Sequence, residues 1–385
     1  MTALSTDFTL DTLPAHTMAV LHALALLPAG ESKAALLALL QLNLIRDEHG
    51  KAVNGDKLGV ILGDLEHRGA ILRTAGLPYR IAPAARNAVL LQLMDEQAEL
   101  SAWAELLCEH LPLPRNQWDV PTATAIQLRL WLAILHEAEL AVRDEPLLAS
   151  FLHMTVLRHA TLEDVLAFHL SSKLASPVMD ARALMELFRE AFAANPAIIE
   201  AVRADITACY ERDPACDSYS TPLLYFKGFH ALQSQRVTHW LWQEGRKTLA
   251  YFLQNRISEV MGADIHPAAR IGHGVMLDHG TGIVVGETAV IGNNVSILQG
   301  VTLGGTGKEG GDRHPKVRSG VMIGAGAKIL GNIEIGEGAK VGAGSIVLHP
   351  VAPHTTVVGN PARQVGKPRH ARPALDMDQS FDGDS

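Results

Sequence analysis

The chain has 385 residues, a length typical of two or three domains. Hydrophobic residues make up 48% of the chain and charged residues 19%, a composition that permits large buried cores and excludes global disorder. The 33 Lys and Arg against 41 Asp and Glu give a formal net charge of −8, which argues against a protein held to nucleic acid by phosphate contacts.

The cysteines and the N-terminal residues predict a cytoplasmic protein. Cys108, Cys209 and Cys216 are too few and too widely spaced for a disulfide framework or a Cys-rich zinc site, and they fit reduced thiols. The first residues include acidic side chains and no basic cluster, so we expect no secretory signal. The most apolar early run, Met18 to Leu27, is too short to span a bilayer, so we expect no membrane association.

Residues 1–120 form the first predicted region. Its predicted elements are helices over 15–27, 31–42 and 56–68, and a hairpin that pairs 70–73 with 79–82. This is the order of elements in a winged-helix domain, a fold typical of DNA binding. The region carries 9 Lys or Arg against 14 Asp or Glu, whereas a domain that binds DNA should be basic. We therefore expect a packing or regulatory domain.

Residues 121–262 are predicted to form a second helical region. Apolar spacing predicts helices over 123–141, 145–158, 181–192, 220–245 and 246–261. Ser220 and Pro222 suit the first turn of a helix, with the hydroxyl as its cap, and Gly262 suits a helix end. We expect Trp240 and Trp242 to be core residues.

Residues 263–360 carry a six-residue repeat. Its apolar positions are Ile265, Ile271, Leu277, Val285, Ile291, Ile297, Leu303, Val317, Ile323, Ile329, Ile335, Val341 and Val347. The register slips by two residues between Leu277 and Val285, and by eight between Leu303 and Val317. A short fixed period is typical of a solenoid, and a flexible Gly-rich linker would not keep apolar residues in register.

A period of six with Gly after the apolar position suits a parallel β-helix, in which each side of a triangular coil takes one hexad. The apolar residue then points inward and stacks on its counterpart one coil away. The segment Gly304–Lys316 interrupts the repeat. We predict that it forms a loop on a rigid scaffold, where functional residues tend to lie.

Motifs from residue 140 to residue 380 closely resemble those of the bacterial serine O-acetyltransferases, which belong to the hexapeptide-repeat acyltransferases. The matching stretches are Asp213-Pro-Ala, Tyr219-Ser-Thr-Pro-Leu-Leu-Tyr, Gly228-Phe-His-Ala-Leu-Gln, His239-Trp-Leu-Trp, Asp264-Ile-His-Pro-Ala-Ala, Leu277-Asp-His-Gly-Thr-Gly-Ile-Val-Val-Gly-Glu-Thr, Val301-Thr-Leu-Gly-Gly-Thr-Gly-Lys, Gly311-Asp-Arg-His-Pro-Lys and Gly359-Asn-Pro-Ala-Arg. The resemblance implies that residues 263–360 form a left-handed parallel β-helix. Together with the helical regions predicted at 1–120, which have no counterpart in the shorter bacterial enzymes, and at 121–262, and with a tail at 361–385, this predicts an α + β chain.

The resemblance implies acetyl transfer from acetyl-CoA to the hydroxyl of L-serine, the first step of cysteine biosynthesis. A serine hydroxyl needs a base during attack, and histidine is the natural base near neutral pH. His279 matches the family's catalytic histidine, and Asp264 matches the carboxylate that orients it. Histidines such as His266, His273 and His314 are also zinc ligands by residue type, as in a γ-class carbonic anhydrase, but their motifs fit acetyl transfer better, so we expect no metal.

Substrate and cofactor positions also carry over from the family. Arg313 suits the serine carboxylate, because its planar fork can bind two oxygens. Asp213 and Asp278 suit the ammonium group, and His314 can add a hydrogen bond. The positions expected to contact acetyl-CoA are Gly305, Thr306, Ala325, Lys340 and Ala343.

The resemblance further implies a trimer-based oligomer, a hexamer in the family, with each active site between two subunits and with L-cysteine as feedback inhibitor. The family's C-terminal tail ends in isoleucine and docks into O-acetylserine sulfhydrylase. Here the chain ends at Ser385 without that apolar anchor, so formation of the complex is not expected. Two alternatives stay open: an acceptor such as homoserine or a sugar, and a regulatory or binding protein that acts through residues 1–120.

Overall fold

The computed structural model describes residues 13–26, 36–37, 40, 45–46, 51–73, 79–82, 85–86, 88–89, 120–307 and 310–379. The chain divides into two compact units, residues 1–165 and 166–385, and each is described by itself. Within the described residues, none of the helices combines the length and the apolar character needed to cross a membrane.

The first unit contains two of the predicted N-terminal helices, α1 (Ala15–Leu26) and α3 (Gly55–His67). The side chain of Asn54 caps α3 by accepting a hydrogen bond from the backbone N of Lys57 at 2.9 Å. The predicted hairpin is confirmed, because β1 (Ile71–Leu72) pairs antiparallel with β2 (Arg80–Ile81). Most of the predicted helix over 31–42 lies outside the described residues.

The second half of this unit confirms one predicted helix and corrects another. The helix predicted over 123–141 is α6 (Val120–Asp144). The segment predicted as a helix over 145–158 is helical without interruption from Pro146 to Leu157, but it is not one regular α-helix. It consists of the 3-10 turn η2 (Pro146–Leu148), α7 (Ala149–Leu152) and the π-helical turn η3 (His153–Leu157). Pro146 lacks an N–H and begins a new element, which the Glu145 carboxylate caps.

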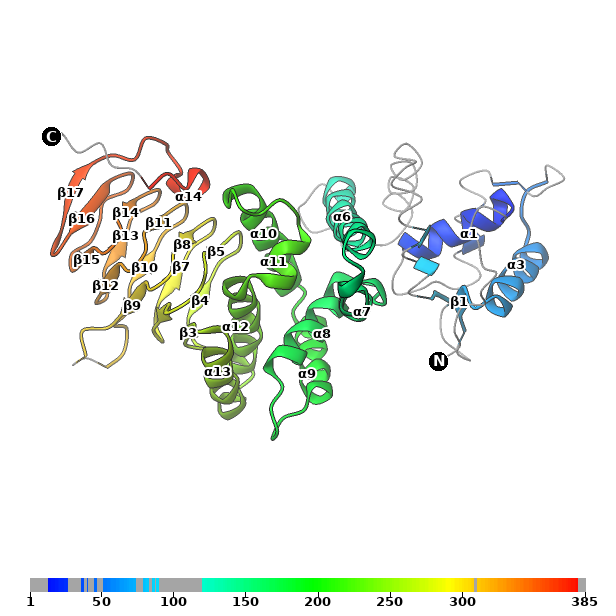
Figure 1. Cartoon of the computed structure of the whole chain (residues 1–385), viewed down its shortest axis with the longest axis horizontal. Coiled ribbons are helices and arrows are strands. Elements are labelled where there is room, and N and C mark those ends of the chain that lie inside the picture. Colours follow the sequence, from blue (N-terminus) through cyan, green and yellow to red (C-terminus); the bar gives the residue numbers. More distant parts are fainter. Residues whose placement is uncertain are drawn as a thin grey trace. The chain divides into compact units, whose positions relative to one another are not determined.

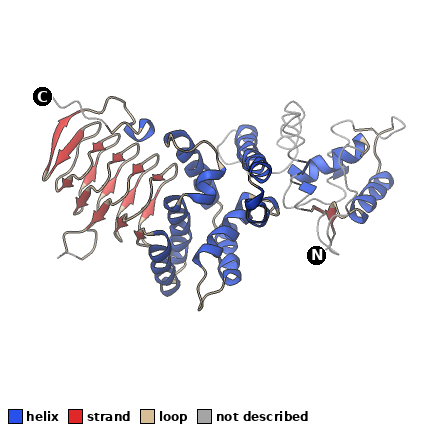
Figure 2. Cartoon of the chain, viewed as in Figure 1, coloured by secondary structure: helices blue, strands red, loops and turns tan. Residues whose placement is uncertain are grey.

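Helix α8 crosses the boundary between the units, and further helices of the second unit precede the strands of the β-helix (Figures 1 and 2). The helices are α8 (Leu162–Leu174), α9 (Ala181–Ala194), α10 (Ala197–Arg212), α11 (Ser220–Tyr225), α12 (Lys227–Gln243) and α13 (Lys247–Met261). The predicted end of the last one is confirmed, since Gly262 takes the left-handed conformation with φ 74°. Trp240 is buried as predicted, while Trp242 is half-buried against Tyr251.

The single helix predicted over 220–245 is broken at Phe226, which has extended backbone. Ser220 is the first residue of α11 and not its cap. The break lets α12 begin against the turn that follows Leu277. A Cβ on Gly228 would lie 2.0 Å from the carbonyl oxygen of Leu277, so only glycine fits there. This close approach is a tertiary constraint that apolar spacing does not encode.

The β-helix consists of three sheets of short strands. The strands are β3 (Asp264–Ile265), β4 (Arg270–Ile271), β5 (Met276–Leu277), β6 (Val284–Val285), β7 (Val290–Ile291), β8 (Ser296–Ile297), β9 (Thr302–Gly304), β10 (Lys316–Val317), β11 (Met322–Ile323), β12 (Lys328–Leu330), β13 (Glu334–Ile335), β14 (Lys340–Val341), β15 (Ile346–Val347), β16 (Thr356–Gly359) and β17 (Ala362–Gly366). The first sheet has the order β15-β12-β9-β6-β3, the second β13-β10-β7-β4, and the third β17-β16-β14-β11-β8-β5.

The predicted inward residues stack in columns, one in each sheet. The first column is Ile265, Val285, Leu303, Ile329 and Val347; the second is Ile271, Ile291, Val317 and Ile335; the third is Leu277, Ile297, Ile323 and Val341. All of these except Ile271 are buried. The parallel pairing confirms that one hexad forms one side of each coil.

The two slips in the repeat lie at two different corners of the coil. The chain passes from the third sheet to the first at residues 278–282, 299–300, 325–326 and 343–344, which we call the glycine edge. It passes from the first sheet to the second at residues 286–288, 305–307 and 310–315, which we call the arginine edge. The first sheet therefore lies between the two edges.

The C-terminal segment folds back onto the outer face of the third sheet. Its short helix α14 (Pro373–Asp376) follows the β16–β17 hairpin, and Figure 1 shows α14 near β8 and α10. Ser296 Oγ donates to the carbonyl oxygen of Ala374 at 2.8 Å. Ala374 and Lys340 are both buried.

Candidate active site

His279 lies at the glycine edge, in the turn created by the two-residue slip. Its backbone has φ 56°, a left-handed conformation that is uncommon for a residue other than glycine. The side chain is 70% exposed, and its Nε2 lies 3.7 Å from Oδ1 of Asp278. The turn is backed by α12, because Gly228 and Gly280 leave no room for a Cβ between them. A strained turn therefore presents the imidazole to solvent.

Asp213 and Asp278 lie close enough for their charges to interact, one at the end of α10 and the other in the turn after β5. Asp213 is the C-cap of α10, and its Oδ1 accepts a hydrogen bond from the backbone N of Ala215 at 2.9 Å. Burial raises the pKa of the Asp278 carboxyl, the His279 imidazole lowers it, and the negative charge of Asp213 raises it further. A cationic group between the two carboxylates would relieve their repulsion.

Asp264 lies beside this turn without contacting the imidazole. The backbone N of Asp264 donates to the carbonyl oxygen of Ile283 at 2.9 Å, so β3 lies directly against the end of the turn. The Asp264 carboxylate is exposed and accepts a hydrogen bond from Gln254 Nε2 at 2.7 Å. No hydrogen bond joins Asp264 to His279 in the described part of the chain. The sequence analysis did not predict Gln254, which lies on α13. Its hydrogen-bond partner, Asp264, is ten residues away in sequence, and no motif links the two residues.

At the arginine edge, the guanidinium of Arg313 is already paired. Its Nη2 donates to Oε2 of Glu287 at 2.8 Å and its Nη1 to the carbonyl oxygen of Gly311 at 3.1 Å. The hydrogen bond from Arg313 lowers the pKa of the Glu287 carboxyl. Sequence reasoning missed Glu287, although it lies in the same matching stretch as His279. The guanidinium of Arg313, which is predicted to bind the carboxylate of the substrate, thus pairs with the carboxylate of Glu287 in this structure.

His314 is held rigidly in the same loop. The backbone N of Thr288 donates to Nδ1 of His314 at 3.2 Å, which assigns the proton of the neutral ring to Nε2. Thr288 Oγ1 accepts from the backbone N of both Arg313 and His314. A Cβ on Gly286 would lie 2.0 Å from the His314 ring, so the ring packs flat against that backbone. Burial lowers the pKa of His314, which favours the neutral donor form.

The predicted cofactor positions are divided between the edges. Ala325 and Ala343 lie on the glycine edge beside Gly326 and Gly344, on the coils that follow His279. Gly305 and Thr306 follow β9 at the arginine edge, and Gly305 lies under the Arg313 side chain. Lys340 lies within β14, and its side chain is buried instead of pointing from either edge.

A ladder of backbone hydrogen bonds runs along the glycine edge. The donors are the N–H groups of Gly282, Gly300, Gly326 and Gly344, and the acceptors are the carbonyl oxygens of Gly262, Thr281, Gln299 and Ala325. These donor glycines all have φ between 66° and 72°. On the two later coils this edge consists of Ala325, Gly326, Ala343 and Gly344, whose small size allows a flexible chain to approach the backbone closely.

The described ranges contain no group of three or more His, Cys, Asp or Glu side chains placed to hold a metal ion.

The sequence of the chain is similar to those of known proteins. Residues 130–234 match the family described as "Serine acetyltransferase, N-terminal", and residues 314–349 match "Bacterial transferase hexapeptide (six repeats)". The serine acetyltransferase of Escherichia coli strain K12 is 63% identical over 254 residues, which cover 66% of this chain and 93% of that protein. The chain belongs to the serine acetyltransferase family.

Solved structures of the family agree in fold. The serine acetyltransferase of Vibrio cholerae O1 biovar El Tor N16961 superposes with a TM-score of 0.66 at 60% identity and covers 67% of this chain and 100% of that one. The hexapeptide match and this likeness identify the coil as the left-handed β-helix predicted from the sequence.

Two further relatives are solved with ligands. One is a serine acetyltransferase in complex with cysteine, with a TM-score of 0.65, 59% identity and coverage of 66% of this chain and 99% of that one. The other, from Brucella abortus strain S19, is in complex with coenzyme A, with a TM-score of 0.62, 52% identity and coverage of 62% and 96%.

Proposed function

We propose that this chain is a serine O-acetyltransferase that moves the acetyl group of acetyl-CoA to the hydroxyl of L-serine, giving O-acetyl-L-serine and CoA. The observation that carries the proposal is the placement of His279 with two carboxylates at one edge of the first sheet and of Arg313 with His314 at the other. The identity to curated serine acetyltransferases and the relatives solved with coenzyme A and cysteine support it.

In the proposed mechanism, His279 acts as general base. It takes the proton of the serine hydroxyl while the oxygen attacks the thioester carbon, and a tetrahedral intermediate forms. When the intermediate collapses, the C–S bond breaks and the same imidazolium returns its proton to the CoA thiolate. Asp264 is proposed as the carboxylate that orients the imidazole, which requires it to exchange its bond from Gln254 for one from His279.

The two charged groups of serine, its ammonium and its carboxylate, are proposed to bind to different residues. Asp213 and Asp278 take the ammonium group, because a cation offsets the repulsion that raises the pKa of Asp278. Arg313 takes the carboxylate by exchanging its bond to Glu287, and the Nε2–H of His314 can donate to the same group. An acceptor without both charged groups, such as a sugar, cannot use both halves of this site.

The pantetheine arm of acetyl-CoA is proposed to lie along the glycine edge, where backbone is accessible at Ala325 and Ala343. Gly305 and Thr306 are proposed to contact the cofactor from the arginine edge. Lys340 is the weakest of the proposed contacts, because burial holds its ammonium away from a solvated phosphate.

The oligomeric state, the cellular location and the regulation of the chain are proposed by analogy with the family. We propose a trimer-based oligomer, a hexamer, with active sites between subunits, cytoplasmic location and feedback inhibition by L-cysteine. The alternative function through residues 1–120 draws no specific support from the described residues.

The test is a thiol-release assay with a panel of acceptors. Wild-type protein with acetyl-CoA is given L-serine, L-homoserine or a sugar, and kcat/KM is compared. We expect L-serine to be preferred, since homoserine moves the hydroxyl by one methylene and a sugar lacks both charges. Preference for either of the other acceptors would replace the proposed substrate while keeping the acetyl-transfer chemistry.

A further inference from the structure

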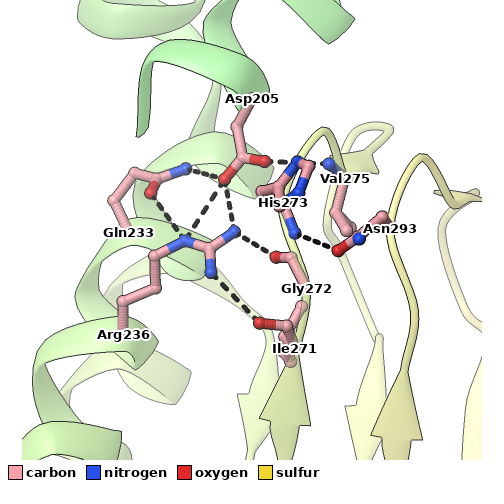
Figure 3. A network of polar contacts seen from close by, with 8 residues as sticks. All are labelled: Asp205, Gln233, Arg236, Ile271, Gly272, His273, Val275 and Asn293. Atoms are coloured by element: carbon pink, nitrogen blue, oxygen red, sulfur yellow. Dashed lines mark hydrogen bonds and ion pairs between the residues drawn. The ribbon is translucent and has the colours of Figure 1, made fainter. Parts of the chain in front are cut away.

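A buried polar network joins two helices to the first coil of the β-helix (Figure 3). Asp205, on α10, has a completely buried side chain. Its Oδ2 accepts hydrogen bonds from Gln233 Nε2 at 2.9 Å and Arg236 Nη2 at 2.6 Å, both on α12. Its Oδ1 accepts from the backbone N of Val275 at 2.8 Å. One carboxylate therefore holds three parts of the chain together.

Arg236 completes the network from α12, with a side chain that is 8% exposed. It donates to the carbonyl oxygens of Ile271 at 3.3 Å and Gly272 at 2.7 Å, at the corner where the first coil passes from the second sheet to the third. Its Nε also donates to Gln233 Oε1 at 3.1 Å. A buried ion pair with this many hydrogen bonds fixes geometry more strongly than its net stabilisation suggests.

Each element in the network also carries part of the serine site. Val275 is followed directly by β5 and then by Asp278 and His279. Asp213 follows Asp205 by eight residues on α10, about 12 Å along the helix axis. Gly228, at the start of α12, packs against the backbone of the turn that holds His279. The network thus lies where the relative positions of the two proposed ammonium-binding carboxylates are set.

A second set of hydrogen bonds holds the C-terminal end of α10. Arg212 Nη1 donates to Ser296 Oγ at 3.2 Å and its Nη2 to Asn294 Oδ1 at 3.3 Å, both on the second coil. Its guanidinium is buried, which lowers its pKa. The helix that ends at Asp213 is thereby fixed to two successive coils.

We propose that the Asp205–Arg236 network positions the amino-acid half of the active site by fixing Asp213 relative to Asp278. This proposal rests on the proposed function. Ala325 and Ala343, the proposed acetyl-CoA positions on the glycine edge, belong to later coils that the network does not touch. Loosening the network should therefore weaken serine binding and leave acetyl-CoA binding intact, a split that a merely structural role would not produce.

The primary test is Asp205→Asn, which keeps the side-chain shape. A single amide cannot accept hydrogen bonds on both sides as the carboxylate does. The matched control is Gln235→Met, which removes another buried bond from α12 to the same coil, that of Nε2 to the carbonyl oxygen of Ala269 at 3.0 Å, without touching α10. We expect KM for L-serine to rise about tenfold in Asp205→Asn, and KM for acetyl-CoA to stay within about twofold.

The control should keep both KM values while its thermal midpoint falls. Equal changes in the serine KM for Asp205→Asn and Gln235→Met would overturn the proposal, as would a parallel rise in both KM values. If Asp205→Asn does not fold, Arg236→Lys loosens the same network, because a lysine cannot replace the bonds that Nε, Nη1 and Nη2 make to Asp205, Ile271 and Gly272. The expected split and the overturning results are the same.

Binding without turnover separates this proposal from the proposed function. If wild-type protein releases no CoA with L-serine, the proposed function fails. Calorimetric titration with L-serine alone then decides the positioning role. Binding about tenfold weaker in Asp205→Asn than in Gln235→Met supports it, and equal binding, or none to wild type, overturns it.

Discussion

The two edges of the first sheet differ in how their functional groups are satisfied. At the glycine edge, the His279 side chain is 70% exposed on a strained turn, and no hydrogen bond holds its ring among the described residues. At the arginine edge, Arg313 and His314 are already bonded to Glu287 and Thr288. If the proposed roles hold, the base His279 must gain its partners when substrate binds, whereas Arg313 and His314 are already oriented and Arg313 must exchange its bond to Glu287 for one to the substrate.

The largest effect is expected at the glycine edge. His279→Ala should lower kcat roughly a thousandfold, because general base catalysis is lost while the rest of the site remains. Thiol release measures kcat, and calorimetry should find acetyl-CoA affinity unchanged. If the variant kept more than about a tenth of the wild-type kcat, His279 would not be the general base, and the proposed difference in function between the two edges would be wrong.

A smaller effect, on binding, is expected at the arginine edge. Arg313→Lys should raise KM for L-serine roughly 10- to 100-fold, because a lysine offers a point charge in place of a planar fork. Arg318→Lys is the matched control, since Arg318 also pairs with a glutamate, Glu334, but on the second sheet. If both variants behave alike in steady-state kinetics, the arginine edge does not recognise the serine carboxylate.

Next in size is a change at the cofactor end of the glycine edge. Gly326→Ala adds a methyl group at a position with open space beside it, so KM for acetyl-CoA should rise about threefold to tenfold with KM for serine unchanged. Gly245→Ala is the control, because Gly245 also has positive φ and open space but follows α12. The two variants share the backbone strain, so a shared kinetic change would trace to strain and not to the edge.

The smallest effect on activity at neutral pH is expected away from both edges. Burial lowers the pKa of His169 to about 4 and that of His230 to about 3, and their rings pack at 5.0 Å. Both stay neutral in the fold, whereas unfolded histidines bind protons below about pH 6.5. Stability is therefore full above that pH and is lost as pH falls toward the folded pKa values.

Each of these histidines should lower the free energy of unfolding by roughly 1 kcal/mol per pH unit as the pH falls from about 6 toward 4. Urea unfolding across this range measures the slope. His230→Gln should flatten it while thiol release at neutral pH stays near wild type. An unchanged slope would show that the buried pair does not govern acid sensitivity.

The sequence predicted the β-helix better than the helices, because the β-helix follows from a local repeat whereas the ends of the helices depend on contacts between residues far apart in sequence. The hexad places one inward residue on each side of every coil, so columns such as Ile265 and Val285 follow from register alone. The break at Phe226 follows from the contact of Gly228 with the carbonyl of Leu277, which is 49 residues away in sequence and leaves no local signal.

The sequence could predict those residues of the candidate site that lie within the motifs shared with the family. Asp213, Asp278 and His279 come together, and Arg313 and His314 share a loop, as their motifs implied. Gln254 and Glu287 were not predicted, because each is defined by the side chain it contacts across coils or helices. Lys340 was chosen for its charge, whereas its alternation in β14 places it on the covered face of the third sheet.

The central claim is acetyl transfer to serine from the His279 edge, and the most direct measurement is CoA release from acetyl-CoA by wild type and His279→Ala, with and without L-serine, with the product identified by mass spectrometry. The account predicts serine-dependent release and O-acetylserine with wild type, and loss of both in the variant. Release that does not depend on serine, or O-acetylserine formed equally well by His279→Ala, would contradict it.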